Sequence, residues 1–469
     1  MTLELYNTLS RKIEALDLDL SSPVRMYHCG PTVYWVQHIG NMRAVFVVDV
    51  LVRTLHLLGL ETKLVRNITD VGHLTGDNLG DADTGADRME NASLREKTSP
   101  EEIAKKYIDI YLNHVNKLGS LPPEHFPKAT DHIPQMIEMV ETLIQNGFAY
   151  ITPKAVYFDT SKVADYTKLS RQKLEDLQNG TGHGNVSDGD KKNSTDFSLW
   201  FFKTGTHQNA LQTWVSPFAS PLVPEGRGFP GWHIECSAMS KYYLGDTLDI
   251  HIGGIEHVPI HHTNEIAQSE SANNKTFAKH WLHYEHLLVD DSKMSKSEGT
   301  SYTVDDLEER GFSGVSLRYF FLQAHYRSKQ NFTWDSLSAS QTALKKLYSA
   351  FIKLPTGGTT SKEYSELFVK ALTNDLGTPA ALALTWELLK DSSVSGADKR
   401  ATLLYFDSVL GLSLDQQTSR DIPDSIKHLA EKRIVAKSEK DWELADKLRS
   451  EIESLGFTLS DTKDGYDLR

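Results

Sequence analysis

Short apolar runs alternate with longer amphipathic stretches in the first part of the chain. Residues 24–59 hold a short apolar run, turns at Gly30-Pro31 and Gly40, and then apolar positions at helical spacing. Residues 64–68 (LVRNI) form a second short apolar run, which Thr-Asp follows. A strand, a helix and a second strand in this order predict a parallel sheet of the α/β class.

The alternation of strand and helix is then interrupted. Residues 99–147 have a helical pattern that opens with Ser-Pro-Glu-Glu, the order expected at a helix start. Residues 179–195 are polar and rich in glycine, with almost nothing to bury. Strand and helix patterns return at 247–251 and 261–272. We therefore predict an insertion between two halves of one sheet.

Beyond about residue 336, apolar positions recur at three- and four-residue spacing, in segments 343–354, 367–389 and 426–452. This spacing predicts amphipathic helices, so we expect a helical C-terminal domain. The expected divisions are 1–115 (first half of the core), 116–228 (the insertion), 229–335 (second half of the core), 336–420 (a helical bundle) and 421–469 (a small C-terminal module).

Composition narrows the class of protein. The 469 residues are 39% hydrophobic and 24% charged, which allows a large core but is too long for one ordinary compact unit. No stretch approaches the roughly 20 apolar residues that span a bilayer, and the first residues lack the apolar run of a secretion signal. We therefore expect a soluble cytoplasmic protein. The net charge of -13 argues only mildly against a polyanionic partner, since local clusters of Lys and Arg decide such binding.

The chain has two cysteines, Cys29 and Cys236, too few for the disulfide framework of a secreted protein. His261 and Glu265 lie four residues apart, so on a helix both project from one face, whereas His262 points elsewhere. Together Cys29, Cys236, His261 and Glu265 offer sulfur, nitrogen and oxygen donors that suit tetrahedral Zn²⁺. The alternative is that both cysteines are inert core thiols and that the His/Glu pair lies on a solvated helix face.

Two further segments have features of phosphate sites. Residues 38–41 (His-Ile-Gly-Asn) lie where a strand–turn–helix unit presents backbone N–H groups to an anion. Residues 293–297 (Lys-Met-Ser-Lys-Ser) combine two lysines with interleaved hydroxyls on a polar loop, a set that could clamp a polyphosphate. Taken alone, the first occurs often by chance and the second has the alternative of a solvated turn.

The order of these two segments resembles the motif pair of class I aminoacyl-tRNA synthetases. The likeness to the cysteinyl members is greater, because residues 27–34 and 231–240 look like their two cysteine-bearing motifs, and residues 66–70 and 264–269 match as well. It covers nearly the whole chain and is thin after about residue 336. The resemblance implies a split Rossmann-type catalytic core with an insertion, followed by an all-helical C-terminal domain.

The resemblance also implies an activity, that of a cysteine–tRNA ligase. Cysteine and ATP would give cysteinyl-adenylate, and the cysteinyl group would then pass to the 3′-terminal adenosine of tRNA(Cys). One Zn²⁺ per chain would select the substrate thiol, with Trp232 lining the floor of the cysteine pocket and Thr69 holding the amino or carboxylate end. The implied zinc ligands are Cys29, Cys236, His261 and Glu265.

For the nucleotide, the resemblance implies ATP with Mg²⁺. His38, Gly40 and Asn41 would contact the phosphates, and Lys296, with Lys293 beside it, would stabilise charge on the leaving pyrophosphate. The module at 421–469 would bind the anticodon end, and the family favours a monomer.

The sequence departs from the family pattern at 71–75 and 255–260. Two alternatives remain open at this point. One is the mycothiol-type ligase, which joins cysteine to a glucosaminyl-inositol conjugate on a similar core and is shorter at its C-terminus. The other is an inactive paralogue that binds RNA without chemistry.

Overall fold

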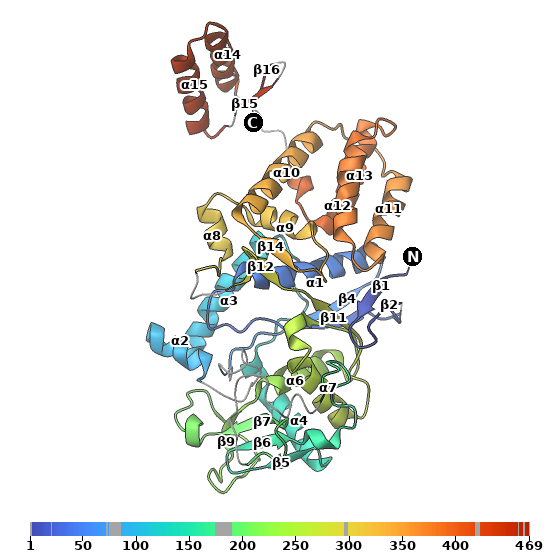
Figure 1. Ribbon diagram of the computed structural model, residues 1–469, viewed down its shortest axis with the longest axis vertical. Helices are drawn as coiled ribbons and strands as arrows, with labels where there is room; N and C mark the ends of the chain where they lie inside the picture. Colours follow the sequence, from blue (N-terminus) through green and yellow to red (C-terminus); the bar gives the residue numbers. More distant parts are fainter. Residues whose placement is uncertain are drawn as a thin grey trace. The chain divides into compact units, whose positions relative to one another are not determined.

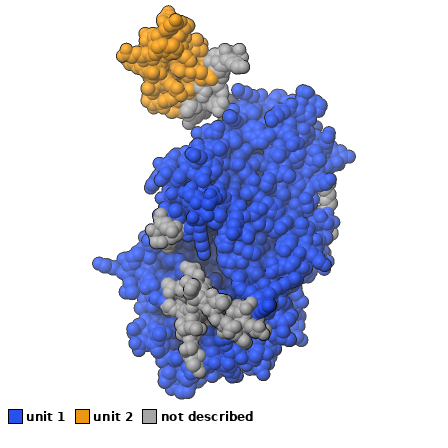
Figure 2. Space-filling model, viewed as in Figure 1, with its two compact units in different colours: residues 1–414 blue, residues 415–469 orange. Residues whose placement is uncertain are grey.

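The structure is a computed structural model of the full chain, which divides into two compact units, Met1–Leu414 and Asp415–Arg469 (Figure 2). The residues described are 2–19, 21–71, 74, 86–173, 190–294, 299–417, 423–457, 459–462 and 465–468.

A four-stranded parallel sheet forms the centre of the larger unit (Figure 1). Strand β3 of the N-terminal half pairs with β10 of the second half, so the two halves of the sheet join at this pair. The prediction of a parallel sheet split by an insertion is confirmed. The strand order is β11 (Ala278–Tyr284), β10 (Leu248–Gly254), β3 (Val24–His28) and β4 (Thr62–Arg66).

Helices cover both faces of this sheet. Helix α1 (Ile39–Leu57) joins β3 to β4, α6 (Trp232–Leu244) leads into β10, and α7 (His261–Asn273) joins β10 to β11. Because side chains alternate along a strand, Met26 of β3 packs into the apolar core around α1, whereas its neighbour Tyr27 packs into the core around α6 and α7. The candidate chemistry lies where these helices begin.

The insertion contributes an antiparallel sheet and helices of its own. The helical pattern at 99–147 forms two helices rather than one, because Gly119 has a φ of 71° and prolines follow it. The pattern at 179–195 falls mostly outside the described residues. Helices α2 (Arg88–Glu96) and α3 (Pro100–Lys117) begin before the insertion. The insertion itself holds α4 (Ile133–Gln145) and a sheet in the order β5 (Ala149–Ile151), β6 (Ala155–Phe158), β7 (Phe197–Phe202), β9 (Arg227–Pro230) and β8 (Trp214–Val215).

After the core the chain becomes helical, as predicted. The expected run at 367–389 is divided in two, because Asp375 and Leu376 adopt left-handed φ values of 55° and 52°. The helices α8 (Val304–Glu309) and α9 (Gly314–Leu322) still belong to the second half of the core. The helices that follow it are α10 (Trp334–Ile352), α11 (Lys362–Thr373), α12 (Thr378–Lys390) and α13 (Gly396–Leu410).

Two small sheets accompany the larger unit. In one of them, β1 (Glu4–Asn7) pairs with β2 (Lys12–Ala15) in antiparallel orientation. The other has β12 (Leu287–Val289) between β13 (Ser292–Lys293) and β14 (Gln330–Phe332). The second of these sheets leads directly into the Lys-Met-Ser-Lys-Ser segment.

The smaller unit contains α14 (Asp424–Ser438), α15 (Trp442–Ser454) and a hairpin of β15 (Leu459–Thr462) and β16 (Gly465–Leu468). The two helices were predicted, but the hairpin was not, so this C-terminal module is not all-helical. Arg433 of α14 pairs with Asp461 of the hairpin at 2.7 Å. In the described part of the chain, no helix is both long and apolar enough to cross a membrane.

Candidate active site

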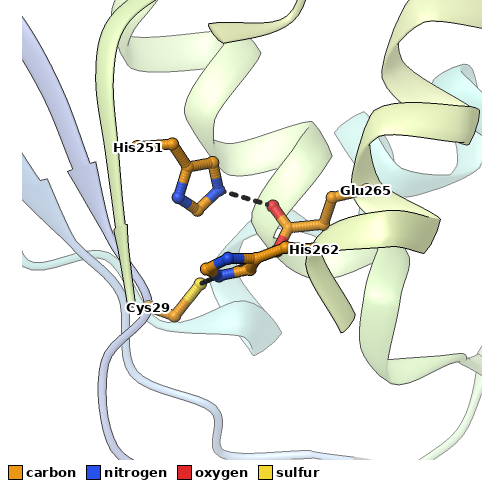
Figure 3. Close-up of side chains that lie close together, drawn as sticks. All are labelled: Cys29, His251, His262 and Glu265. Atoms are coloured by element: carbon orange, nitrogen blue, oxygen red, sulfur yellow. Dashed lines mark hydrogen bonds and ion pairs between the residues drawn. The ribbon is translucent and has the colours of Figure 1, made fainter. Parts of the chain in front are cut away.

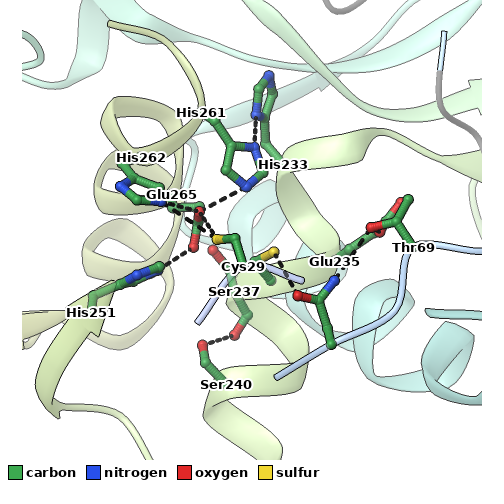
Figure 4. A network of polar contacts seen from close by, with 12 residues as sticks. Cys29, Thr69, His233, Glu235, Ser237, Ser240, His251, His261, His262 and Glu265 are labelled. Atoms are coloured by element: carbon green, nitrogen blue, oxygen red, sulfur yellow. Dashed lines mark hydrogen bonds and ion pairs between the residues drawn. The ribbon is translucent and has the colours of Figure 1, made fainter. Parts of the chain in front are cut away.

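The four side chains predicted as metal ligands come together from three parts of the chain. Cys29 directly follows β3, Cys236 lies in α6, and His261 and Glu265 lie one turn apart at the start of α7. All four are buried, and their ligand atoms lie within 4.8 Å of one another. Figure 4 shows how this cluster continues into a wider network of polar contacts.

The tight turn after Cys29 depends on glycine. A Cβ at Gly30 would lie 1.7 Å from the carbonyl oxygen of Asn67, so only glycine fits there. The backbone N–H of Gly30 donates to Asn67 Oδ1 at 2.8 Å, and the same oxygen lies 3.9 Å from Cys236 Sγ. This close approach brings the end of β3 against α6 and holds the two cysteines near each other.

Charge is concentrated in the cluster. Glu265 Oε1 lies 2.9 Å from His261 Nε2, and Glu265 Oε2 lies 2.8 Å from His251 Nε2. Burial alone would raise the pKa of Glu265, but the histidines outweigh it and hold that pKa well below its ordinary value. Burial likewise disfavours the charged form of His261, yet Glu265 and Cys236 raise its pKa to about 10.

The two thiols differ. Burial and the neighbouring Cys236 raise the pKa of Cys29 well above its ordinary value. For Cys236, burial is opposed by hydrogen bonds from Cys29 and His261, which lower its pKa to about 6. A carboxylate and a thiolate therefore lie side by side in a buried site, where a cation would be strongly favoured.

The donor set fits a zinc ion. Two sulfurs, one imidazole nitrogen and one carboxylate oxygen converge without a backbone rearrangement, and these are the ligand types of tetrahedral zinc sites. An oxygen-loving cation such as Mg²⁺ would be poorly served by two sulfurs.

A second set of potential ligands overlaps the first. Cys29 and Glu265 also form a group with His251 and His262, again with all ligand atoms within 4.8 Å (Figure 3). His262 Nε2 lies 3.4 Å from Cys29 Sγ, so the prediction that His262 points elsewhere is wrong. The Cys29 thiol lies within reach of both His262 and Glu265, because residues three apart on a helix are neighbours on its surface.

Trp232 lies beside the cluster. Its ring stacks on His261 with 4.0 Å between ring centroids and 24° between planes. His233 lies near both rings, and its Nδ1 is 2.9 Å from His261 Nδ1. Trp232 is only partly buried, whereas both histidines are buried, so Trp232 lies at the edge of the cluster.

Thr69 approaches the cluster from the other side. Its hydroxyl donates to Glu235 Oε2 at 2.9 Å, and Asn67 Nδ2 donates to Thr69 Oγ1 at 3.3 Å (Figure 4). Burial, reinforced by Cys236, raises the pKa of Glu235 well above its ordinary value. Thr69 therefore contacts the residue that precedes Cys236.

Sequence reasoning missed most of the histidines around this centre. His251 and His283 lie on β10 and β11, at positions where a buried strand usually has apolar residues, and both are buried. His262 Nδ1 lies 2.7 Å from His283 Nε2, whose ring reaches Thr8 through Nδ1. A histidine inside an apolar strand pattern was the available signal.

The His-Ile-Gly-Asn turn begins α1. His38 is the N-cap, and its Nδ1 accepts from the N–H of Gly40 at 3.1 Å, while Asn41 Oδ1 accepts from the N–H of His38 at 3.2 Å. A Cβ at Gly40 would lie 2.4 Å from Met294 Cε. The turn and the Lys-Met-Ser-Lys-Ser segment, far apart in sequence, are therefore in contact.

The lysines of that segment are less completely described. Lys293 is exposed and lies at the end of β13. Lys296 lies outside the described residues. After the segment the chain returns to the turn, because the N–H of Ile39 donates to the carbonyl oxygen of Tyr302 at 2.8 Å.

Comparison with known proteins decides the family. The family described as the tRNA synthetases class I (C) catalytic domain matches residues 18–342. The cysteine–tRNA ligase 1 of Burkholderia lata is 42% identical, in an alignment that covers 100% of this chain and 97% of that protein. The cysteine–tRNA ligase of Opitutus terrae is 40% identical, with 100% and 99% covered. The chain belongs to the cysteine–tRNA ligase family.

Membership of the cysteine–tRNA ligase family confirms the resemblance found in the sequence, and it does not favour the mycothiol-type ligase or an inactive paralogue. Among solved structures, the methionyl-tRNA synthetase of Mycobacterium tuberculosis with methionyl-adenylate is similar, with a TM-score of 0.54 and 14% identity over 84% of this chain and 92% of that one. That likeness shows a shared class I fold.

Proposed function

We propose that this chain activates L-cysteine with ATP and transfers it to tRNA(Cys). The observation that carries the proposal is the convergence of Cys29, Cys236, His261 and Glu265 beside the ring of Trp232. A cluster of thiol-type metal ligands in the same parallel-sheet core as a phosphate-type helix start supports this reading.

Zn²⁺, one per chain, would be held by Cys29, Cys236, His261 and Glu265. When bound, it supplies a soft Lewis acid that favours a thiolate over a hydroxyl. A pocket that only measures size separates substrates differing by one small group by about 10- to 200-fold, so a metal offers cysteine a greater advantage over serine.

The protein side chains around the centre would orient the amino acid. Trp232, stacked on His261, would form the floor of the pocket, and Thr69 would face the amino or carboxylate end. Each of the two residues is held by a contact at the cluster. Trp232 stacks on the proposed ligand His261, and Thr69 bonds to Glu235, the residue before the proposed ligand Cys236. A substrate placed here would meet already ordered groups.

The nucleotide would bind at the start of α1. The cysteine carboxylate would attack the α-phosphorus of ATP, whose phosphates Mg²⁺ accompanies, and pyrophosphate would leave. His38, Gly40 and Asn41 would contact the phosphates, because the positive end of the α1 dipole favours anions and the first turn of α1 has no acidic side chain. Lys296 and Lys293 would stabilise the charge on the leaving group.

A hydroxyl of the terminal adenosine of tRNA would then attack the adenylate, and AMP would leave. We assign residues 1–115 and 229–335 to the catalytic core, 116–228 to the insertion, 336–420 to the helical bundle and 421–469 to an anticodon-binding module. We further propose a monomer in the cytoplasm. The support for these assignments is the family membership of the chain.

The test is charging of total tRNA by the purified protein, with cysteine-dependent pyrophosphate exchange recorded on the same preparation. We expect charging with cysteine, none with serine, and loss of both activities with a zinc chelator. Exchange without charging would favour a mycothiol-type ligase instead. Absence of both activities would contradict the proposal.

A further inference from the structure

Arg43 lies one turn into α1, two residues after the His-Ile-Gly-Asn turn, and is 2% exposed. Its guanidinium donates to four backbone carbonyls. Nη1 donates to Glu285 and His286 at 2.7 and 2.9 Å, and Nη2 donates to His325 and Ser328 at 3.2 and 2.7 Å. These four bonds attach Arg43 to two loops from other parts of the chain. None of the four acceptors belongs to the zinc-type cluster.

These two loops determine where the lysine segment begins. Glu285 and His286 immediately precede β12, and Ser328 lies two residues before β14. Strand β12 pairs with β14 on one side and with β13, which ends at Lys293, on the other. The small sheet that carries the first lysine is therefore attached to α1 through the Arg43 fork.

Two other contacts join the same regions. Met294 packs against Gly40, where a Cβ would lie 2.4 Å from Met294 Cε, and the N–H of Ile39 donates to the carbonyl oxygen of Tyr302. Residues before and after the lysine segment are thus both in contact with the start of α1. Arg43 adds the only side-chain fork among these contacts, and its planar geometry fixes direction as well as distance.

We infer that Arg43 is a positioning residue for adenylate formation, which holds β13 and its Lys293, at the entry to the lysine segment, in register with the proposed phosphate-binding start of α1. This inference rests on the proposed function. Because a displacement of about 1 Å in a reacting group can cost about 100-fold in rate, loss of the fork should depress the rate of activation without changing how cysteine binds.

A second buried arginine provides a matched control. Arg318 of α9 is fully buried and also reaches α1, where its Nη2 lies 2.6 Å from Asp49 Oδ2, and its Nε donates to the carbonyl oxygen of Leu410 at 2.5 Å. Its partners belong to α1 and α13, not to the loops that precede β12 and β14. Arg318→Met should therefore lower stability as Arg43→Met does, but without moving the lysine segment.

The experiment measures pyrophosphate exchange, zinc content and Tm for Arg43→Met, Arg43→Lys and Arg318→Met beside the unaltered protein. We expect kcat to fall about 100-fold in Arg43→Met and about 10-fold in Arg43→Lys, with the cysteine KM and zinc content unchanged. In Arg318→Met, kcat should change by less than about threefold although Tm falls. If Arg43→Met does not fold, Arg43→Lys carries the comparison.

A double-mutant cycle separates positioning from general loosening. If Arg43 acts through the lysine segment, Arg43→Lys should lower kcat by less than about threefold when Lys296→Ala is already present, because the two effects are then not additive. Equal tenfold losses in both backgrounds, or an Arg43→Lys protein as active as Arg318→Met, would overturn the inference. No exchange by the unaltered protein would instead overturn the proposed function itself.

Discussion

The zinc-type cluster and the phosphate-type turn are built in different ways. In the cluster, buried side chains contact one another: the Glu265 carboxylate lies 2.9 and 2.8 Å from two histidine nitrogens, and the Cys29 thiol is in contact with Glu265 as well. At the turn, His38 and Asn41 form a capping box with the backbone, and the nearby Lys293 is exposed.

Under the proposed function, the difference follows from what each region would recognise. Selection of a thiol over a hydroxyl depends on a short-range bond, which requires fixed, dehydrated donors. Polyphosphate carries several charges, so helix N–H groups and lysines approaching from another loop can stabilise it at longer range. Changes in the cluster should therefore abolish recognition, whereas changes at the turn and lysine segment should reduce the rate.

The largest expected effect is that of Cys236→Ser. Cys236 belongs to the first ligand set and not to the second, so its loss also distinguishes between them. We expect bound zinc to fall from about one per chain to near zero, because a thiolate ligand is removed, and cysteine-dependent exchange to fall by about 1,000-fold or more. Metal analysis and exchange assays check this.

The matched substitution in the second ligand set, that of Cys29, His251, His262 and Glu265, is His262→Gln. This variant should keep zinc, although the second set loses a nitrogen, and circular dichroism should show both proteins folded. Stoichiometric zinc in Cys236→Ser together with zinc loss in His262→Gln would contradict the assignment and move the metal to Cys29, His251, His262 and Glu265.

The second prediction concerns the lysine segment. Lys296→Ala should lower kcat for exchange about 100-fold and leave the cysteine KM nearly unchanged, because its contact strengthens as charge moves to the leaving pyrophosphate. Lys362→Ala, on an exposed part of the bundle, is the control and should have no effect. A raised cysteine KM at unchanged kcat would show that Lys296 binds the amino acid rather than the transition state.

The same comparison explains what the sequence could predict. His261 and Glu265 were predictable as a pair because helical spacing puts residues four apart on one face. Their donor types made a shared zinc site with Cys29 and Cys236 possible, but inert core thiols stayed an equal alternative until the resemblance was considered, since no local rule states that β3 ends against α6. That contact depends on Gly30, whose missing side chain allows the approach to Asn67.

The outer parts of the site could not be predicted. His251 and His283 come from strands whose pattern otherwise reads as apolar, and their contacts depend on how β10 and β11 pair. The bonds from Arg43 to four carbonyls depend on two loops that follow β11 and α9, and loop geometry has no periodicity in the sequence. The parallel sheet and the helices were predicted better, because the period and length of the apolar segments determine them.

The third prediction tests the edge of the cluster. Trp232→Leu should raise the cysteine KM about 10-fold with a smaller effect on kcat, because the ring stacked on His261 is lost from the pocket floor. Trp386→Leu, in α12, removes a comparable partly buried ring whose Nε1 donates to Tyr319 OH and should leave the KM unchanged. Equal losses in both variants would mean that Trp232 is only a packing residue.

The smallest expected effect separates the clustered histidines from one outside the cluster. His280 lies on β11 with His283, but burial, only partly opposed by Glu14 and Asp375, lowers its pKa to about 4. An unfolded histidine titrates near 6.5, so the unfolded state binds more protons between these values. The contribution of neutral His280 to the unfolding free energy is therefore fully present above about pH 6.5 and is lost as the pH falls toward 4.

From pH 7 to pH 5 this linkage amounts to about 2 kcal/mol of unfolding free energy. His280→Gln should remove that part of the pH dependence, because glutamine keeps a polar side chain but does not titrate. Urea unfolding of both proteins at the two pH values measures the difference, in which the other titrating groups cancel. If the unfolding free energy of both proteins changes equally between pH 7 and pH 5, His280 does not have a lowered pKa. The acid sensitivity of the fold would then come from the histidines of the cluster.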